Sequence, residues 1–269
     1  MRKDTYIYSS SAAEELRLGI LNEVYNPAAK ATLLDLNIKE KKSILEVACG
    51  QGELACWIAE ITPAAEVVGI DISDEQLDFA RRKARERGLT NLKFIKLSAL
   101  DIEQLPAILG HEFRPELIYC RWLLCHLTIS FREQVMVKLY EILGSGGVMI
   151  HEELSLRESL TSESTASYKH WVELFERLAA ILEIDFDIGA KLFQQMIKIC
   201  YQKVSEKRIA PLFSANQYNF FNLDLSCSAG VLQDLNVINS AELISLQHRL
   251  DSEINDQTYM VNYQVWGFK

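Results

Sequence analysis

The segment between residues 43 and 61 most constrains what this chain can fold into. A short apolar run over 43–48 passes into a turn that contains Gly50 and Gly52, and a helical pattern over 53–61 follows at once. Glycine adopts the backbone conformations of a tight turn, and amide groups at a helix start attract electron-rich ligand atoms. The segment therefore predicts a buried strand, a ligand-binding loop and a helix, although the glycines could also serve only to shape the turn.

The same alternation continues along the chain. A helix is expected over 74–87, with Ser73 as its N-cap. Further strands are expected at 66–70, 92–97, 117–120, 148–150 and 259–267. Strands that alternate with helices form right-handed βαβ units around a parallel sheet. We therefore expect an α/β fold with a doubly wound, mostly parallel sheet, forming a single domain over 1–269.

Two regions depart from this alternation and contain helical patterns only. One is the N-terminal segment, 1–40. The other covers 155–204, where apolar residues from Trp171 to Leu182 recur with helical spacing. These later helices either cover the sheet or form a lid over a ligand site, and the sequence leaves both interpretations open.

Charge and cysteine usage narrow the class of partners. The formal net charge is −9, which disfavours non-specific binding to nucleic acid or to anionic membranes. No apolar run approaches the ~18 residues that a membrane span needs. The six cysteines form no Cys-x-x-Cys pair and stand beside no histidine cluster, so no metal site is expected. We expect a reduced cytoplasmic protein without nucleic-acid or membrane partners, and a homodimer is left open.

The expected strand ends carry residues that could bind a nucleotide-like ligand. Gly50-x-Gly52-x-x-Ala55 also matches a dinucleotide fingerprint, and Asp71 stands where a carboxylate could bind ribose hydroxyls. Glu46 separates the candidates because its carboxylate would repel a pyrophosphate at this loop. A ligand with a cationic amino-acid end would instead be attracted.

With these residues in view, the chain resembles the class I S-adenosylmethionine-dependent methyltransferases that act on small molecules. The resemblance runs from about Glu15 to Glu153 and weakens beyond. Five stretches carry it: the glycine motif Leu45–Gly52, the ribose-binding strand end Val68–Ser73, the adenine motif Asp101–Pro106, the segment Cys120–Leu127 and the turn Leu143–Gly147. The family usually has glycine where Ala48 stands, and Phe-Asp where Pro115-Glu116 stands.

This resemblance implies a Rossmann-like methyltransferase fold with seven strands, S-adenosylmethionine as cofactor and a small-molecule methyl acceptor. It also implies a set of cofactor-binding residues: Glu46, Ala48, Cys49, Gly50, Gly52, Asp71, Ile72, Gln76, Leu100, Asp101, Ile102, Cys120 and Arg121. Two other functions remain open, a non-catalytic S-adenosylmethionine-binding protein and an NAD-dependent dehydrogenase.

Methyl transfer from a sulfonium mainly requires alignment, and a base is needed only when the nucleophile must lose a proton. The candidate catalytic residues are His126, Glu152 and Glu153, near the ends of the fourth and fifth strands. His126 could equally be a structural histidine. The two glutamates should alternate faces, so at most one is expected to face the site. We expect the helices from about 161 to 202 to close over a pocket whose floor is lined by Arg121, His126 and one of Glu152 or Glu153.

Overall fold

The computed structural model describes residues 7, 8, 12–253 and 258–269. Its centre is a seven-stranded sheet in the order β3-β2-β1-β4-β5-β7-β6. The strands are β1 (Ser43–Val47), β2 (Glu66–Asp71), β3 (Leu92–Lys96), β4 (Leu117–Arg121), β5 (Val148–Ser155), β6 (Gln202–Ile209) and β7 (Val261–Phe268). The first five are parallel, whereas β7 runs antiparallel to β5 and β6 antiparallel to β7. The sheet is therefore mixed, with its parallel part as expected.

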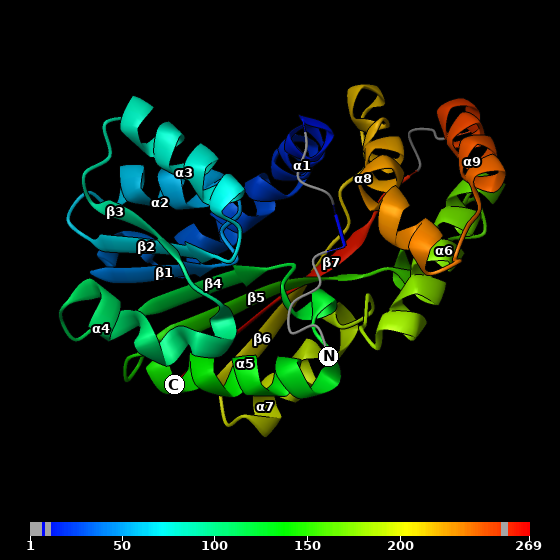
Figure 1. Ribbon diagram of the computed structural model, residues 1–269. Coiled ribbons are helices and arrows are strands. Elements are labelled where there is room, and N and C mark those ends of the chain that lie inside the picture. Colours follow the sequence, from blue (N-terminus) through cyan, green and yellow to red (C-terminus); the bar gives the residue numbers. More distant parts are fainter. Residues whose placement is uncertain (1–6, 9–11, 254–257) are drawn as a thin grey trace.

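Nine helices of the described residues surround this sheet. They are α1 (Ala12–Asp35), α2 (Glu53–Ile61), α3 (Asp74–Glu86), α4 (Leu105–Leu109), α5 (Ile129–Ile142), α6 (Ala166–Leu182), α7 (Leu192–Lys198), α8 (Phe220–Asp234) and α9 (Ser240–Glu253). Figure 1 shows α1, α2 and α3 on one face of the sheet and α4, α5 and α7 on the other. The helices α6, α8 and α9 gather at the end of the sheet toward which β5 runs (Figure 1).

Alternating residues of β1 supply the two cores. Ile44 packs with Leu33 of α1 and Ile58 of α2 in one buried cluster. Leu45 points to the opposite face and belongs to a second cluster with Leu139 of α5. A strand covered on both faces reads as a continuous apolar run, which is why β1 was visible in the sequence.

Three expectations about the second half of the chain need correction. The region 155–204 is not only helical, because β6 begins at Gln202. β5 continues to Ser155, well beyond the expected end at residue 150, because β7 pairs with it along its whole length. The helices α8 and α9 were not predicted. None of the described helices has the length and apolar character that a bilayer-spanning segment needs.

Candidate functional site

The loop after β1 depends on left-handed backbone conformations at three positions. Ala48, Gly50 and Gly52 have φ values of 56°, 50° and 66°. Ala48 therefore occupies, with a side chain, a conformation that favours glycine. At Gly52 a Cβ atom would lie 2.5 Å from the ring of Phe94 and 2.8 Å from Cβ of Ala80, so only glycine fits there without displacement.

Asp71 at the end of β2 holds this loop in place. The backbone N–H of Gly50 donates to Oδ2 of Asp71 (2.9 Å), and the N–H of Ser73 donates to Oδ1 (2.9 Å). Ser73 in turn caps α3, because its hydroxyl accepts the N–H of Gln76 (3.3 Å). Burial raises the pKa of the Asp71 carboxyl, while these N–H groups lower it. The carboxylate thus joins the glycine loop to the start of α3.

A cavity of about 460 Å³ opens beyond the carboxyl ends of the parallel strands. It lies where β1 and β4 are neighbours and the strand order reverses, the usual ligand position in a doubly wound sheet. Ten of the residues named from the sequence line it: Glu46, Ala48, Cys49, Gly50, Asp71, Ile72, Gln76, Leu100, Arg121 and His126.

Six other residues named from the sequence do not line the cavity. Gly52, Ile102 and Cys120 are buried in the packing behind it. Asp101, expected at the adenine, is exposed within the 3₁₀ helix η2 (Ala99–Gln104), and the adjacent wall consists of Leu97 to Leu100 instead. Glu152 and Glu153 are the remaining two.

Both glutamates are fully buried, and their carboxylates accept hydrogen bonds from neighbouring parts of the fold. Glu152 accepts from the hydroxyl of Tyr119 (2.5 Å) and from the side-chain amides of Asn262 (3.1 Å) and Gln264 (2.9 Å). Its role is therefore to join β4, β5 and β7.

Glu153 accepts three backbone N–H groups around the 3₁₀ helix η3 (Leu124–His126), from Leu123 (3.0 Å), Leu124 (2.8 Å) and Cys125 (3.2 Å). Burial raises its pKa to about 7 although these donors lower it. The placement of both carboxylates contradicts the expectation that one of them faces the site.

His126, the third candidate, does lie in the cavity wall. Its ring makes edge-to-face contacts with Tyr8 (6.0 Å between centroids) and Phe186 (5.8 Å). Burial, with a smaller effect of the nearby Arg17, lowers its pKa to about 4. The imidazole is therefore neutral at pH 7.

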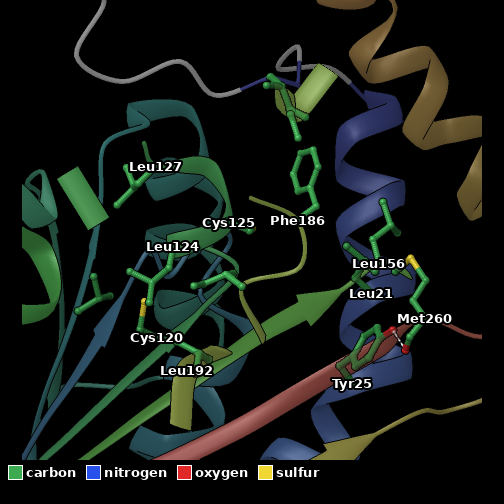
Figure 2. Packing of buried hydrophobic residues seen from close by; sticks show 14 of the residues in the cluster. Leu21, Tyr25, Cys120, Leu124, Cys125, Leu127, Leu156, Phe186, Leu192 and Met260 are labelled. Carbon is green, nitrogen blue, oxygen red and sulfur yellow. Dashed lines mark hydrogen bonds between the residues drawn. The ribbon is translucent and has the colours of Figure 1, made fainter. Parts of the chain in front are cut away.

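Of the two helices expected to form a lid, α6 contributes Trp171 and Phe175 to the wall, whereas α7 contributes no residue. Instead α1 and the unpredicted α8 complete the wall, the latter through Phe220 and Asp224. Figure 2 shows part of the buried apolar cluster behind and around the cavity. Of the residues labelled there, five line the cavity: Leu21, Leu127, Leu156, Phe186 and Met260. Nearby, Tyr25 fixes this arrangement by donating to the carbonyl of Met260 (2.8 Å; Figure 2).

Buried polar atoms without a hydrogen-bond partner among the described residues concentrate in this wall. They are Oε2 of Glu46, Nε2 of Gln51, Oε1 of Gln76, Nη1 of Arg121, Nε1 of Trp122, Nε1 of Trp171 and Oδ2 of Asp224. Buried polar groups are rarely left unpaired in native proteins. Their concentration at one cavity indicates that a polar ligand supplies the missing partners.

Glu46 and Arg121 place an acidic and a basic side chain at this end of the cavity. Burial raises the pKa of Glu46 to about 8, although the charge of Arg121 lowers it. Arg121 donates to Oδ1 of Asn22 (2.9 Å), and its guanidinium carbon lies 4.7 Å from the centre of the Trp122 ring. A zwitterionic ligand would match both groups.

A family model described as a methyltransferase domain matches residues 38–217. The chain belongs to this methyltransferase family. Among its relatives, the demethylmenaquinone methyltransferase of Thermus thermophilus is 47% identical over 62 residues, 23% of this chain and 28% of that protein. The tRNA (guanine-N(7)-)-methyltransferase of Rubrobacter xylanophilus is 27% identical over 175 residues, 61% of this chain and 70% of that protein.

Solved structures share the fold of this methyltransferase domain. YcgJ from Bacillus subtilis superimposes with a TM-score of 0.55 at 14% identity, covering 89% of this chain and 98% of that one. The magnesium protoporphyrin IX methyltransferase of Synechocystis, solved with bound SAH, has a TM-score of 0.54 at 10% identity over 96% of this chain and 88% of its own. At such identities the likeness concerns the fold alone.

Proposed function

We propose that this protein transfers the methyl group of S-adenosylmethionine to a small-molecule acceptor. The observation that carries the proposal is Glu46, a buried carboxylate in the cavity wall whose Oε2 has no partner among the described residues. An ammonium group satisfies such an oxygen and favours the ionised form of this carboxyl, whose pKa burial raises to about 8. The pyrophosphate of a dinucleotide offers no donor and would be repelled by the ionised form. This favours the amino-acid end of S-adenosylmethionine over NAD.

The remaining groups of the cofactor have matching partners in the wall. Each carboxylate oxygen of Asp71 already accepts one backbone N–H. Each can accept a second hydrogen bond, and the ribose hydroxyls of the cofactor are suitable donors. The side chains of Ile72 and Leu100 offer apolar surface for the adenine, and Ile72 is 42% exposed without a ligand. The unpaired Nη1 of Arg121 suits the carboxylate of the methionine moiety.

When bound, the cofactor supplies a methyl group on an activated sulfonium leaving group. The protein's part is then to align the acceptor with this carbon and to exclude water, which can lower the barrier by up to ~7–11 kcal/mol in ideal cases. Trp171, Phe175 and Phe220 give the wall the apolar surface that excludes water. His126 is neutral at pH 7 but a weak base, because burial lowers its pKa to about 4, so no protein base is assigned to the reaction.

A small acceptor is supported by the enclosed aromatic part of the cavity, which suits a compact organic molecule. The net charge of −9 argues in the same direction, because a polyanionic RNA would be repelled. RNA-modifying enzymes occur among the relatives, so a transfer-RNA transcript belongs among the acceptors that are tested.

Calorimetric titration tests the cofactor first. S-adenosylhomocysteine should bind the wild-type protein and NADH should not. Binding of NADH without binding of S-adenosylhomocysteine would overturn the proposal in favour of a dehydrogenase. Incubation with methyl-labelled cofactor and fractionated cell extract then tests turnover. Label should pass to small molecules, whereas tight cofactor binding with no transfer would indicate a non-catalytic binding protein.

A further inference from the structure

We propose that Phe186 limits the size of the methyl acceptor, because its ring forms a fixed wall in the acceptor half of the cavity. This inference rests on the proposed methyltransferase function, since it names the residue that selects among acceptors of the same reaction. Phe186 belongs to the connection between α6 and α7, residues 183–191, all of which the structure describes. It is buried, and no other residue of this connection lines the cavity (Figure 2).

Two aspartates anchor the connection on either side of Phe186. Asp185 accepts from Nη1 of Arg132, a buried arginine of α5 (3.3 Å). Asp187 accepts the backbone N–H of Arg157, which follows β5 (2.8 Å). The backbone N–H of Asp187 also donates to Oδ1 of Asp185 (3.0 Å), so the two anchors are joined across the residue between them. The backbone at Phe186 is therefore fixed from α5 and from the end of β5.

The backbone of Phe186 is itself bonded to the cavity wall. Its carbonyl accepts the N–H of Leu156 (3.0 Å), a residue that lines the cavity as well. Three residues later, a Cβ atom at Gly189 would collide with the carbonyl oxygens of Glu153 and Leu154, so the chain lies directly against β5. The connection cannot move away from β5 without losing these contacts, and a ligand therefore meets the ring of Phe186 as a rigid surface.

The contacts of the ring show which space it takes up. Phe186 meets His126 of η3 edge to face (5.8 Å between ring centroids) and Phe175 of α6 in the same way (5.9 Å). Both partners line the cavity. Removal of the ring would therefore enlarge this cavity instead of leaving a separate void elsewhere in the core.

The position of Phe186 along the sheet separates it from the proposed cofactor contacts. Asp71 ends β2, whereas Phe186 is bonded to Leu156 just beyond β5. In the order β2-β1-β4-β5 these strand ends are three spacings of ~4.8 Å apart, or about 14 Å. A change at Phe186 should therefore alter the binding of the acceptor and leave the ribose contact intact.

A series of 1-alkanols, from 1-butanol to 1-decanol, tests this size limit on protein saturated with S-adenosylhomocysteine. Each added CH₂ group should tighten binding about fourfold while apolar space remains. In isothermal titrations of the wild type, the affinity should rise with chain length and then stop rising at a cut-off length. Phe186→Ala should move this cut-off to chains that are about two or more carbons longer, and Phe186→Trp should move it to shorter chains.

Phe193→Ala is the matched control, because it is the same substitution on α7, which lines no part of the cavity. Its cut-off should equal that of the wild type. Phe186→Leu is the milder variant if Phe186→Ala does not fold, and its cut-off should lie about one carbon beyond that of the wild type. Each variant should bind S-adenosylhomocysteine within about threefold of the wild type, which separates a changed wall from a lost fold.

Three results would overturn the inference: no alkanol binding to the wild type, an affinity that rises through the whole series, or equal cut-offs in the wild type and the Phe186 variants. A failure of S-adenosylhomocysteine to bind the wild type would instead count against the methyltransferase proposal. The alkanol series on the cofactor-free protein would then still test the wall formed by Phe186.

Discussion

The carboxylate of Asp71 accepts the backbone N–H of Gly50 at 2.9 Å, and this one contact ties the end of β2 to the loop that follows β1. The loop and the carboxylate proposed to bind the ribose therefore form one structural unit. Because the second oxygen bonds the N–H of Ser73, the same residue also orients the start of α3. A change at Asp71 must therefore affect both the proposed ligand contact and the shape of the loop.

Asp71→Ala should weaken the binding of S-adenosylhomocysteine by roughly 10–100-fold, because hydrogen bonds to a charged group contribute ~1.5–3 kcal/mol. Titration calorimetry measures this directly. Asp74→Ala, an exposed change in the first turn of α3, is the control and should leave the affinity within twofold. An unchanged affinity in folded Asp71→Ala would mean that Asp71 only shapes the loop.

Gly52→Ala should lower the free energy of unfolding far more than Gly50→Ala, although both glycines have positive φ. A Cβ at Gly52 meets the Phe94 ring at 2.5 Å, whereas a Cβ at Gly50 meets nothing within 4 Å. Backbone strain alone costs ~1 kcal/mol, and overpacking adds ~1–3 kcal/mol. Urea denaturation of the two variants measures the difference, and equal destabilisation would contradict the observed packing.

Glu46→Gln should stabilise the folded protein at alkaline pH and lower its affinity for the cofactor. The folded-state pKa of about 8 lies above the usual 4.5, so the folded state holds the proton more tightly than the unfolded state. The stability of the wild type relative to the variant therefore falls as pH rises from about 4.5 to about 8, by roughly 3–5 kcal/mol in total. Urea denaturation at pH 5 and pH 9 tests the sign.

The same variant should bind S-adenosylhomocysteine about tenfold or more weakly at pH 7, because the ammonium group loses a carboxyl that ionises when the two groups pair. Glu75→Gln, an exposed change on α3, is the matched control for both measurements. A variant that binds the cofactor as tightly as the wild type would remove the main support for the placement of the amino-acid end.

Glu153→Ala should destabilise the protein by about 3 kcal/mol or more, because three backbone N–H groups lose their acceptor in a buried place. Glu158→Ala, an exposed change just beyond β5, should cost less than about 1 kcal/mol. Affinity for S-adenosylhomocysteine should be retained at temperatures where Glu153→Ala is folded. A large loss of cofactor affinity with no loss of stability would restore a direct role for this residue in the site.

The sequence predicted those parts of the fold that are specified locally. β1 is an apolar run because it is covered on both faces, and Gly52 stands where only glycine fits, so both left a signal. β6 left none, because it is an edge strand whose surface carries Lys203, Glu206 and Lys207, and charge on an edge strand prevents pairing with other chains.

The sequence predicted the site residues that lie at the end of a single strand. It failed for residues whose role depends on contacts between segments that are distant in the sequence. Glu152 appeared as a catalytic candidate because nothing near it in sequence shows that Asn262 and Gln264 donate to it across 110 and 112 residues. Asp224 was missed for the same reason. It is buried in an ion pair with Arg17, which is 207 residues away. Burial of a carboxylate by partners remote in sequence is a property of the assembled fold.

Hydrogen exchange should separate the helices that border the cavity from the one that does not. α6 and α8 supply Trp171, Phe175, Phe220 and Asp224 to the wall, whereas α7 packs on β6 and β7 and supplies no lining residue. S-adenosylhomocysteine should therefore slow exchange in 166–182 and 220–234 by about tenfold or more, since a ligand that binds only the folded state suppresses local opening. Exchange in 192–198 should change little, which makes α7 an internal control. Uniform protection of all three helices would indicate global stabilisation only, and unchanged exchange in α6 would mean that this helix is scaffold rather than a cover for the acceptor.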